Sequence, residues 1–166
     1  MKPNAPVPLP QADPALFLAD LDVATVPALF AAFVAALAER HLAQERDALL
    51  GVLLEREAVG TTATGQGVAL PHVRSHVVTA TALAFARLRR PLDFGAADGL
   101  PVRAAALLVA PYGVPGALYQ PLLAVLAEAA HDEAGRLRLL EVETFPDFDR
   151  LMRKSIRPRL QEVLSR

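Results

Sequence analysis

A nearly continuous apolar run from Val102 to Val109 limits the folds open to this chain more than any other feature. A strand with one solvated face alternates between apolar and polar residues, whereas a continuous run is typical of a strand that is covered on both faces. Helices usually provide that cover. The run therefore predicts a buried strand in an α/β domain.

The segments around this run alternate between strand and helix patterns. Residues 15–23 and 77–88 predict two further strands, and Arg89-Arg90-Pro91 is expected to end the second one. Pro121 is tolerable only in the first turn of its helix. Helices are predicted over residues 26–40, 45–58, 117–130, 132–140 and 146–154, with an amphipathic tail over 156–166. We predict an α/β fold, a three-layer α/β/α domain with a mixed β-sheet flanked by helices.

The composition narrows the function classes. A chain of 166 residues suits one domain, expected over 15–166, and the proline-rich residues 1–14 are expected to be a flexible lead-in. A net charge of −1 argues against nucleic-acid binding, and the absence of cysteine excludes thiolate metal sites. The apolar stretch Ala28–Ala38 is too short, at ~11 residues, to span a bilayer, so we expect a cytoplasmic protein without membrane insertion.

One segment gathers turn-forming residues ahead of a single histidine; from Arg56 to His72 it reads REAVGTTATGQGVALPH. Gly65 and Gly67 let backbone N–H groups approach a ligand closely, and Arg56 is a planar cation suited to phosphate. Pro71 fixes the backbone that presents His72. Further donors come from hydroxyl groups: Thr61, Thr62 and Thr64. The segment predicts an imidazole surrounded by anion-binding groups, which suits transient phosphorylation.

This segment resembles the enzyme IIA domains of the bacterial sugar phosphotransferase system, of the fructose/mannitol and nitrogen-regulatory (PtsN-like) type. Members read approximately R-E-x-x-x-S-T-G-I-G-x-G-V-A-I-P-H. A second run supports the resemblance through Pro-Leu-Asp-Phe, Asp-Gly-Leu-Pro-Val and Leu-Val-Ala-Pro, between Arg90 and Pro111. The resemblance covers roughly residues 16 to 155. It implies the family's three-layer fold.

The resemblance implies that His72 accepts a phosphoryl group and that Arg56 is the arginine of the site. On the residues alone, His72 could simply pack after a proline turn, and Arg56 could offset the dipole of its helix. The resemblance favours the functional interpretation for both residues.

The remaining phosphate-binding candidates are Thr62, Gly65, Gly67 and Arg74. Each has a structural alternative: Thr62 could cap a turn through its hydroxyl, and the two glycines could belong to an ordinary turn. For Arg74, a solvated surface arginine is the favoured alternative.

One position departs from the family pattern. Members carry a second histidine at the start of the helix that follows the Leu-Val-x-Pro strand, and Tyr119 stands there in this chain. A tyrosine can donate one hydrogen bond through its hydroxyl, but it does not titrate near neutral pH as a histidine does. We therefore count Tyr119 among the catalytic candidates, against the alternative of a half-buried aromatic at a helix start. This departure bears on onward transfer of the phosphoryl group.

The other histidines do not predict a metal site. His76 follows His72 by four residues in what should be extended chain, where the two rings would stand ~13 Å apart. His41 and His131 fall near helix ends. We expect no metal and no cofactor.

The resemblance implies a phosphocarrier that takes a phosphoryl group from an HPr-type protein and passes it to a IIB domain or signals to a regulated protein. The alternative is a transfer-deficient regulatory binding module of the same fold. A small hydrolase with His72 as its base ranks last, because no serine or cysteine nucleophile accompanies it.

Overall fold

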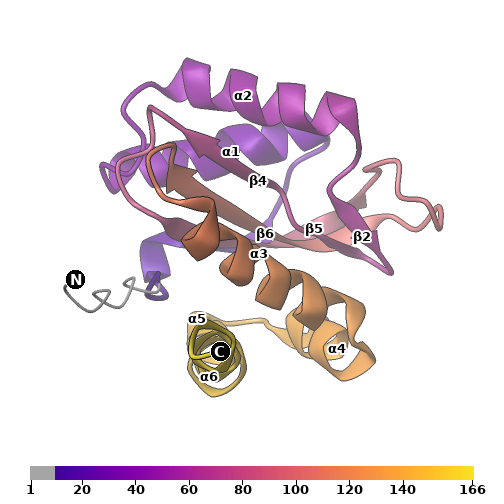
Figure 1. Ribbon diagram of the computed structural model, residues 1–166. Coiled ribbons are helices and arrows are strands. Elements are labelled where there is room, and N and C mark those ends of the chain that lie inside the picture. Colours follow the sequence, from indigo (N-terminus) through magenta and orange to yellow (C-terminus); the bar gives the residue numbers. More distant parts are fainter. Residues whose placement is uncertain (1–9) are drawn as a thin grey trace.

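The computed structural model describes residues 10–166, which form three layers (Figure 1). Helices α1 (Val26–Glu39) and α2 (Arg46–Val59) cover one face of a six-stranded sheet. Helices α3 (Gly116–His131) and α4 (Glu133–Glu141) lie on the other face, together with the C-terminal helices. The predicted three-layer α/β/α domain with a mixed sheet is therefore confirmed.

The sheet is built around β6 (Val102–Pro111), the strand predicted from the apolar run. Its order is β1-β5-β6-β3-β2, and β4 also pairs with β6. β6 runs antiparallel to β5 and parallel to β3 and β4. The other strands are β1 (Phe17–Leu21), β2 (Ala63–Gly65), β3 (Val68–Ala69), β4 (His72–Ser75) and β5 (Ala82–Leu92).

Two apolar cores explain why β6 shows no alternation. Leu107 and Val109 belong to the core beneath α1 and α2, whereas Leu108 and Ala110 belong to the core beneath α3. Successive side chains of a strand point to opposite faces, and both faces are covered here. In the second core the Phe85 ring stacks on other aromatic rings, at centroid distances of 5.7 Å from Phe17 and 5.0 Å from Phe148.

The second predicted strand differs at both ends. It begins at Ala82 instead of 77 because a turn and loop follow β4. It continues through Arg89-Arg90-Pro91 to Leu92, so the prediction that these residues end it is wrong. The pairing of β5 with β6 is irregular between Arg87 and Leu92, and such an irregularity accommodates a proline that has no N–H to donate.

The helices follow the predicted ranges with local exceptions. Thr25 caps α1, since its Oγ1 accepts a hydrogen bond of 3.2 Å from the N–H of Ala28. Pro121 lies in the second turn of α3, not the first, and leaves the carbonyl of Ala117 without its helical donor. A π-helical segment, Met152–Ile156, joins α5 (Phe145–Leu151) to α6 (Arg157–Leu164), so the predicted last helix and tail form one rod.

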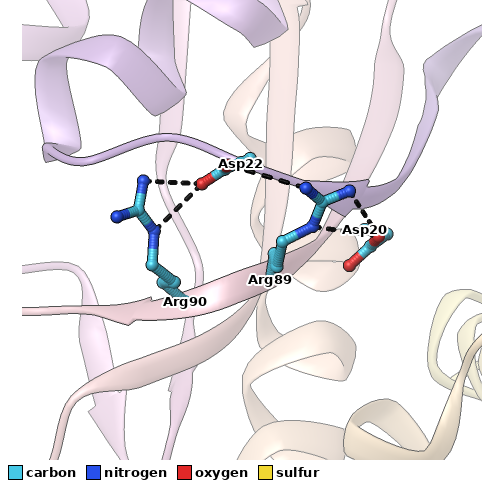
Figure 2. Close-up of polar contacts among 4 residues, drawn as sticks. All are labelled: Asp20, Asp22, Arg89 and Arg90. Carbon is cyan, nitrogen blue, oxygen red and sulfur yellow. Dashed lines mark hydrogen bonds and ion pairs between the residues drawn. The ribbon is translucent and has the colours of Figure 1, made fainter.

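An ion-pair cluster fastens the end of β1 to β5 (Figure 2). The guanidinium of Arg89 lies 2.7 Å from Asp20 and 3.6 Å from Asp22, and Arg90 lies 2.7 Å from Asp22. All four side chains are largely exposed, so solvent screens these ion pairs and each contributes little to stability. Charges at this place also discourage other strands from pairing with the β1 edge.

The predicted flexible lead-in falls mostly on residues 1–9, which lie outside the described residues. Its last part packs on the domain. Pro10 is buried and its carbonyl accepts a hydrogen bond of 3.3 Å from Arg157, while Asp13 pairs with Arg40 at 2.7 Å. Within residues 10–166, no helix is both long enough and apolar enough to cross a bilayer.

Candidate functional site

His72 is the first residue of β4 and is half-buried. Its register opposite Leu108 points the ring to the face of the sheet that α3 covers. The ring Nδ1 lies 2.8 Å from the carbonyl oxygen of Leu70. Because a carbonyl only accepts hydrogen bonds, Nδ1 carries the proton in this contact. In the neutral ring the other nitrogen, Nε2, then keeps its lone pair and is available as a nucleophile.

Arg74 lies two residues further along β4, on the same face of the strand as His72. Its Nη1 donates a hydrogen bond of 2.9 Å to the carbonyl of Val114. Its guanidinium carbon is 5.8 Å from the ring centroid of Tyr112 and 5.4 Å from that of Tyr119. The expectation of a solvated surface arginine is wrong, because both tyrosine rings and a backbone carbonyl hold this half-buried cation beside the histidine.

Tyr119 lies in the first turn of α3 and is 5% exposed. The sequence predicted a half-buried aromatic here as the alternative, but the side chain is fully buried and its hydroxyl has no hydrogen-bond partner among the described residues. Burial raises the pKa of Tyr119 to about 12, and the positive charges of Arg74 and Arg56 act against that shift. The hydroxyl therefore stays protonated and lies within the field of both arginines.

Arg56 stands in the last turn of α2, as predicted, and is half-buried. Its Nη1 donates a hydrogen bond of 2.8 Å to the carbonyl of Gly60, which turns the side chain back over the end of its helix. α2 packs beside β4, and the positive charge of Arg56 acts to lower the pKa of Tyr119. The charges of two arginines, Arg56 and Arg74, thus reach the same tyrosine.

The start of α3 adds backbone donors to this place. The N-cap residue is Pro115, which offers no side-chain hydrogen bond to the first turn. N–H groups at an uncapped helix N-terminus favour an anion. The preceding loop lies against β4, since Tyr112 N–H donates to Ser75 and Arg74 donates to Val114.

Glu57 organises the loop that follows α2. Its carboxylate accepts hydrogen bonds of 2.9 Å from the Thr62 N–H and 2.6 Å from the Thr62 hydroxyl, and the Thr61 hydroxyl lies 3.1 Å from it. Thr62 is buried, and its hydroxyl proton is used in this contact. The structural alternative for Thr62 thus describes its contacts in this structure better than direct phosphate binding does.

Gly65 and Gly67 form the turn of the β2–β3 hairpin, each with a φ of 92°. Val68 pairs with Ala104 and His72 pairs with Leu108, so the hairpin lies ~13 Å along β6 from the histidine. Hydrogen bonds from the backbone N–H groups of Gln66 and Leu100 hold the pKa of the nearby Asp98 below its usual value. This register places both glycines at the hairpin turn and away from His72 along β6, and phosphate binding by their N–H groups stays a prediction.

The remaining histidines lie outside this arrangement. His76 follows β4 and its ring stacks on Tyr112 at a centroid distance of 4.6 Å. In the described part of the chain no group of three or more histidine, aspartate or glutamate side chains is placed to hold a metal ion.

Sequence reasoning assigned no role to Glu57 or Tyr112. The match of Glu57 to the family pattern signalled its importance, and only the fold shows that it braces Thr62. Tyr112 is exposed and its contact with Arg74 depends on the pairing of β4 with β6, which no local pattern reveals.

The chain is similar to curated proteins of two kinds. It is 43% identical over 100 residues to a nitrogen regulatory protein of Bradyrhizobium diazoefficiens, and 35% identical over 100 residues to a fructose-specific EIIA component of the phosphotransferase system in Haloferax volcanii. Each match covers 60% of this chain, and it spans just under two thirds of the relative, 65% and 64% respectively.

Solved structures share the fold. The nitrogen regulatory protein IIA-Ntr of Neisseria meningitidis superimposes with a TM-score of 0.77 and 29% identity, covering 84% of this chain and 94% of the other. The mannitol IIA of Escherichia coli gives a TM-score of 0.67 at 18% identity, over 83% and 96% of the two chains, and shows the fold alone.

A family model covers most of the chain. The model for the phosphoenolpyruvate-dependent sugar phosphotransferase system, EIIA 2, matches residues 12–155, which include β4, α3 and every candidate site residue. The resemblance seen in the sequence is thereby confirmed, and the chain belongs to the EIIA 2 family of the phosphoenolpyruvate-dependent sugar phosphotransferase system.

Proposed function

We propose that this chain is a histidine phosphocarrier that accepts a phosphoryl group on Nε2 of His72 and passes it on or signals through it. The observation that carries the proposal is the hydrogen bond of 2.8 Å between Nδ1 of His72 and the carbonyl of Leu70. It fixes the tautomer in which Nε2 is the unprotonated nitrogen. A neutral ring nitrogen held in one orientation is the nucleophile that phosphoryl transfer requires.

The transfer balances without moving a proton between partners. Nε2 attacks phosphorus, the Nε2–P bond forms, and the P–N bond of the donor's phosphohistidine breaks, so the donor's ring departs as a neutral imidazole. The Nδ1 proton of His72 stays on its hydrogen bond to Leu70. The phosphorylated ring is therefore cationic and leaves readily when the next acceptor attacks.

Positive groups of the site meet the charge of the phosphoryl group. Arg74, two residues from His72, packs against two tyrosine rings, and the charge of Arg56 at the end of α2 acts on one of them, Tyr119. Preorganised cations and backbone donors stabilise a phosphoryl group without reorganising. In this proposal Arg74, Arg56 and the start of α3 bind the phosphoryl oxygens, while Thr62, Gly65 and Gly67 support the fold around them.

The partners follow from the family. The proposed donor is an HPr-type phosphocarrier protein, and the proposed acceptor is a IIB domain or a regulated protein. A solved relative at 17% identity is a complex of the mannitol IIA with phosphorylated mannitol IIB, which supports a IIB domain as one acceptor class. The similarity to nitrogen regulatory proteins supports a signalling role, carried out in the cytoplasm.

A second function remains in competition because of Tyr119. This residue replaces the second histidine of the family and its hydroxyl does not titrate near neutral pH. A carrier without that histidine could bind a partner through the His72 face without passing the phosphoryl group on.

A labelling assay separates these functions. The protein is incubated with phosphoenolpyruvate, enzyme I and HPr, and acid-labile phosphate is measured in the wild type, in His72→Ala and in the control His131→Ala, which changes an exposed histidine at the far end of α3. The proposal predicts label in the wild type and the control but not in His72→Ala. Label that moves to a IIB domain indicates a relay, and label that stays indicates a sensor. An unlabelled wild type contradicts the phosphocarrier and supports the binding module.

A further inference from the structure

The hydroxyl of Tyr119 is a buried polar group that the fold leaves without a partner. The side chain is 5% exposed and its ring is packed in the core beneath α3. A buried hydroxyl without a hydrogen bond is destabilising, because it has lost its contacts with water and gained none in return. Native structures rarely keep such a group. Its presence therefore suggests that the hydroxyl finds its partner in another state of the protein than the unphosphorylated one.

The surroundings of the hydroxyl point to an anion. The Arg74 guanidinium packs against the Tyr119 ring at 5.4 Å, and the charges of Arg74 and Arg56 both act on the hydroxyl. Tyr119 also belongs to the first turn of α3, where backbone N–H groups favour negative charge. An acceptor that arrives among these donors is the partner that the hydroxyl lacks.

Resting on the proposed function of His72, we infer that Tyr119 is the residue that makes this carrier retain its phosphoryl group, because its hydroxyl donates a hydrogen bond to a phosphoryl oxygen on His72. The proton stays on the tyrosine, so no further bond forms or breaks. The hydrogen bond exists only in the phosphorylated protein. Tyr119 therefore shifts the phosphorylation equilibrium toward this protein and away from the donor.

This role has a signature that a packing role lacks. Phenylalanine in place of Tyr119 removes a hydrogen bond from the phosphorylated state only. In the unphosphorylated protein it removes an unpaired buried hydroxyl, which is neutral or stabilising. Tyr119→Phe should therefore weaken the phosphorylation equilibrium, while it leaves the free energy of unfolding of the unphosphorylated protein unchanged or raises it.

The experiment measures the equilibrium constant for phosphoryl exchange with HPr, from the phosphorylated fractions of both proteins, in the wild type, Tyr119→Phe and Tyr119→His. The control is Ser165→Ala, which also removes one side-chain hydroxyl, at an exposed residue near the C-terminal end of the chain. We expect the constant of Tyr119→Phe to fall about tenfold or more, as for the loss of one hydrogen bond to a charged group. Tyr119→His should recover part of it, and Ser165→Ala should match the wild type. The urea midpoint of unphosphorylated Tyr119→Phe should not fall.

The outcomes separate this inference from the proposed function. If the wild type takes no phosphoryl group, both fail. If the wild type is phosphorylated and Tyr119→Phe has the same constant, the inference is wrong and the carrier function stands. If the constant falls together with the urea midpoint, Tyr119 acts through packing and the inference is overturned.

Discussion

At the scale of single residues, hydrogen bonds within the fold hold most polar side chains of the site in one orientation. His72 is fixed by the Leu70 carbonyl, Arg74 by the Val114 carbonyl, and Thr62 by Glu57. Each of these contacts uses one donor or acceptor, and none of them uses Nε2 of His72, the hydroxyl of Tyr119 or the other N–H donors of Arg74. Unused donors beside the Arg74 guanidinium suit one anionic group.

The buried hydroxyl of Tyr119 predicts a loss of stability at high pH. Burial raises its pKa from an ordinary value of 10 to about 12. Between these values the unfolded chain loses the proton and the folded chain keeps it, so the free energy of unfolding falls as pH rises through this window. The expected contribution is roughly 2–3 kcal/mol. Urea unfolding at pH 9 and pH 11.5 should show this decline in the wild type, a smaller one in Tyr119→Phe, and the full decline in Tyr112→Phe.

The sequence was most informative about where single site residues lie, because local patterns fix those positions. His72, the arginine at the end of α2 and the tyrosine at the start of α3 all occupy positions fixed by local pattern, and the sequence predicted each placement. The environment of Arg74 was predicted wrongly because it depends on Tyr112 and Tyr119, which lie at least 38 positions away along the chain and reach it only through strand pairing.

At the scale of elements, the β2–β3 hairpin decides which predicted residues belong to the site. The glycines were expected in a tight turn, and their φ of 92° agrees. Their distance from His72 could not be predicted, because it follows from the register of β3 and β4 on β6, a pairing between segments far apart in sequence. The very short strands β2 and β3 also carry too few residues to show a period.

Gly67→Ala tests the role of the hairpin. Alanine at a φ of 92° is strained, and its Cβ would lie 3.4 Å from Nε of Arg103. We expect a loss of about 1–2 kcal/mol in the free energy of unfolding, with the phosphorylation equilibrium unchanged. Urea unfolding and phosphoryl exchange are measured on the same samples. Gly51→Ala, in open space on α2, should stabilise by about 0.5–1 kcal/mol and serves as the control. A folded Gly67→Ala that exchanges no phosphoryl group would return the glycines to the site.

At the scale of the whole molecule, the sheet separates two cores that share the strand β6. The core beneath α3 carries both the aromatic stack and Tyr119, so the packing of the C-terminal rod also supports the site. Alternation of strand and helix patterns was enough to predict the layers. The continuous rod was not predicted, because Pro158 and the π-helical segment look like breaks in a local pattern.

Phe148→Ala measures how much the rod contributes. The ring is 2% exposed and stacks on Phe85 at 5.0 Å and lies 5.8 Å from Phe17. Its removal should lower the free energy of unfolding by about 3–5 kcal/mol. Leu164→Ala, at a side chain that is 40% exposed, should change it by less than about 1 kcal/mol. If both substitutions lowered the free energy of unfolding equally, the aromatic stack would not be what fastens the C-terminal rod to the sheet.

The central claim is that His72 presents Nε2 because Leu70 holds the proton on Nδ1. The most direct test is a ¹H–¹⁵N spectrum of the imidazole rings in the protein labelled with ¹⁵N at histidine, before and after phosphorylation through HPr. The account predicts a neutral ring protonated on Nδ1 before transfer, and phosphorus bound to Nε2 with the Nδ1 proton retained afterwards. Phosphorus on Nδ1, or a ring of His72 that is unchanged after phosphorylation, would contradict it.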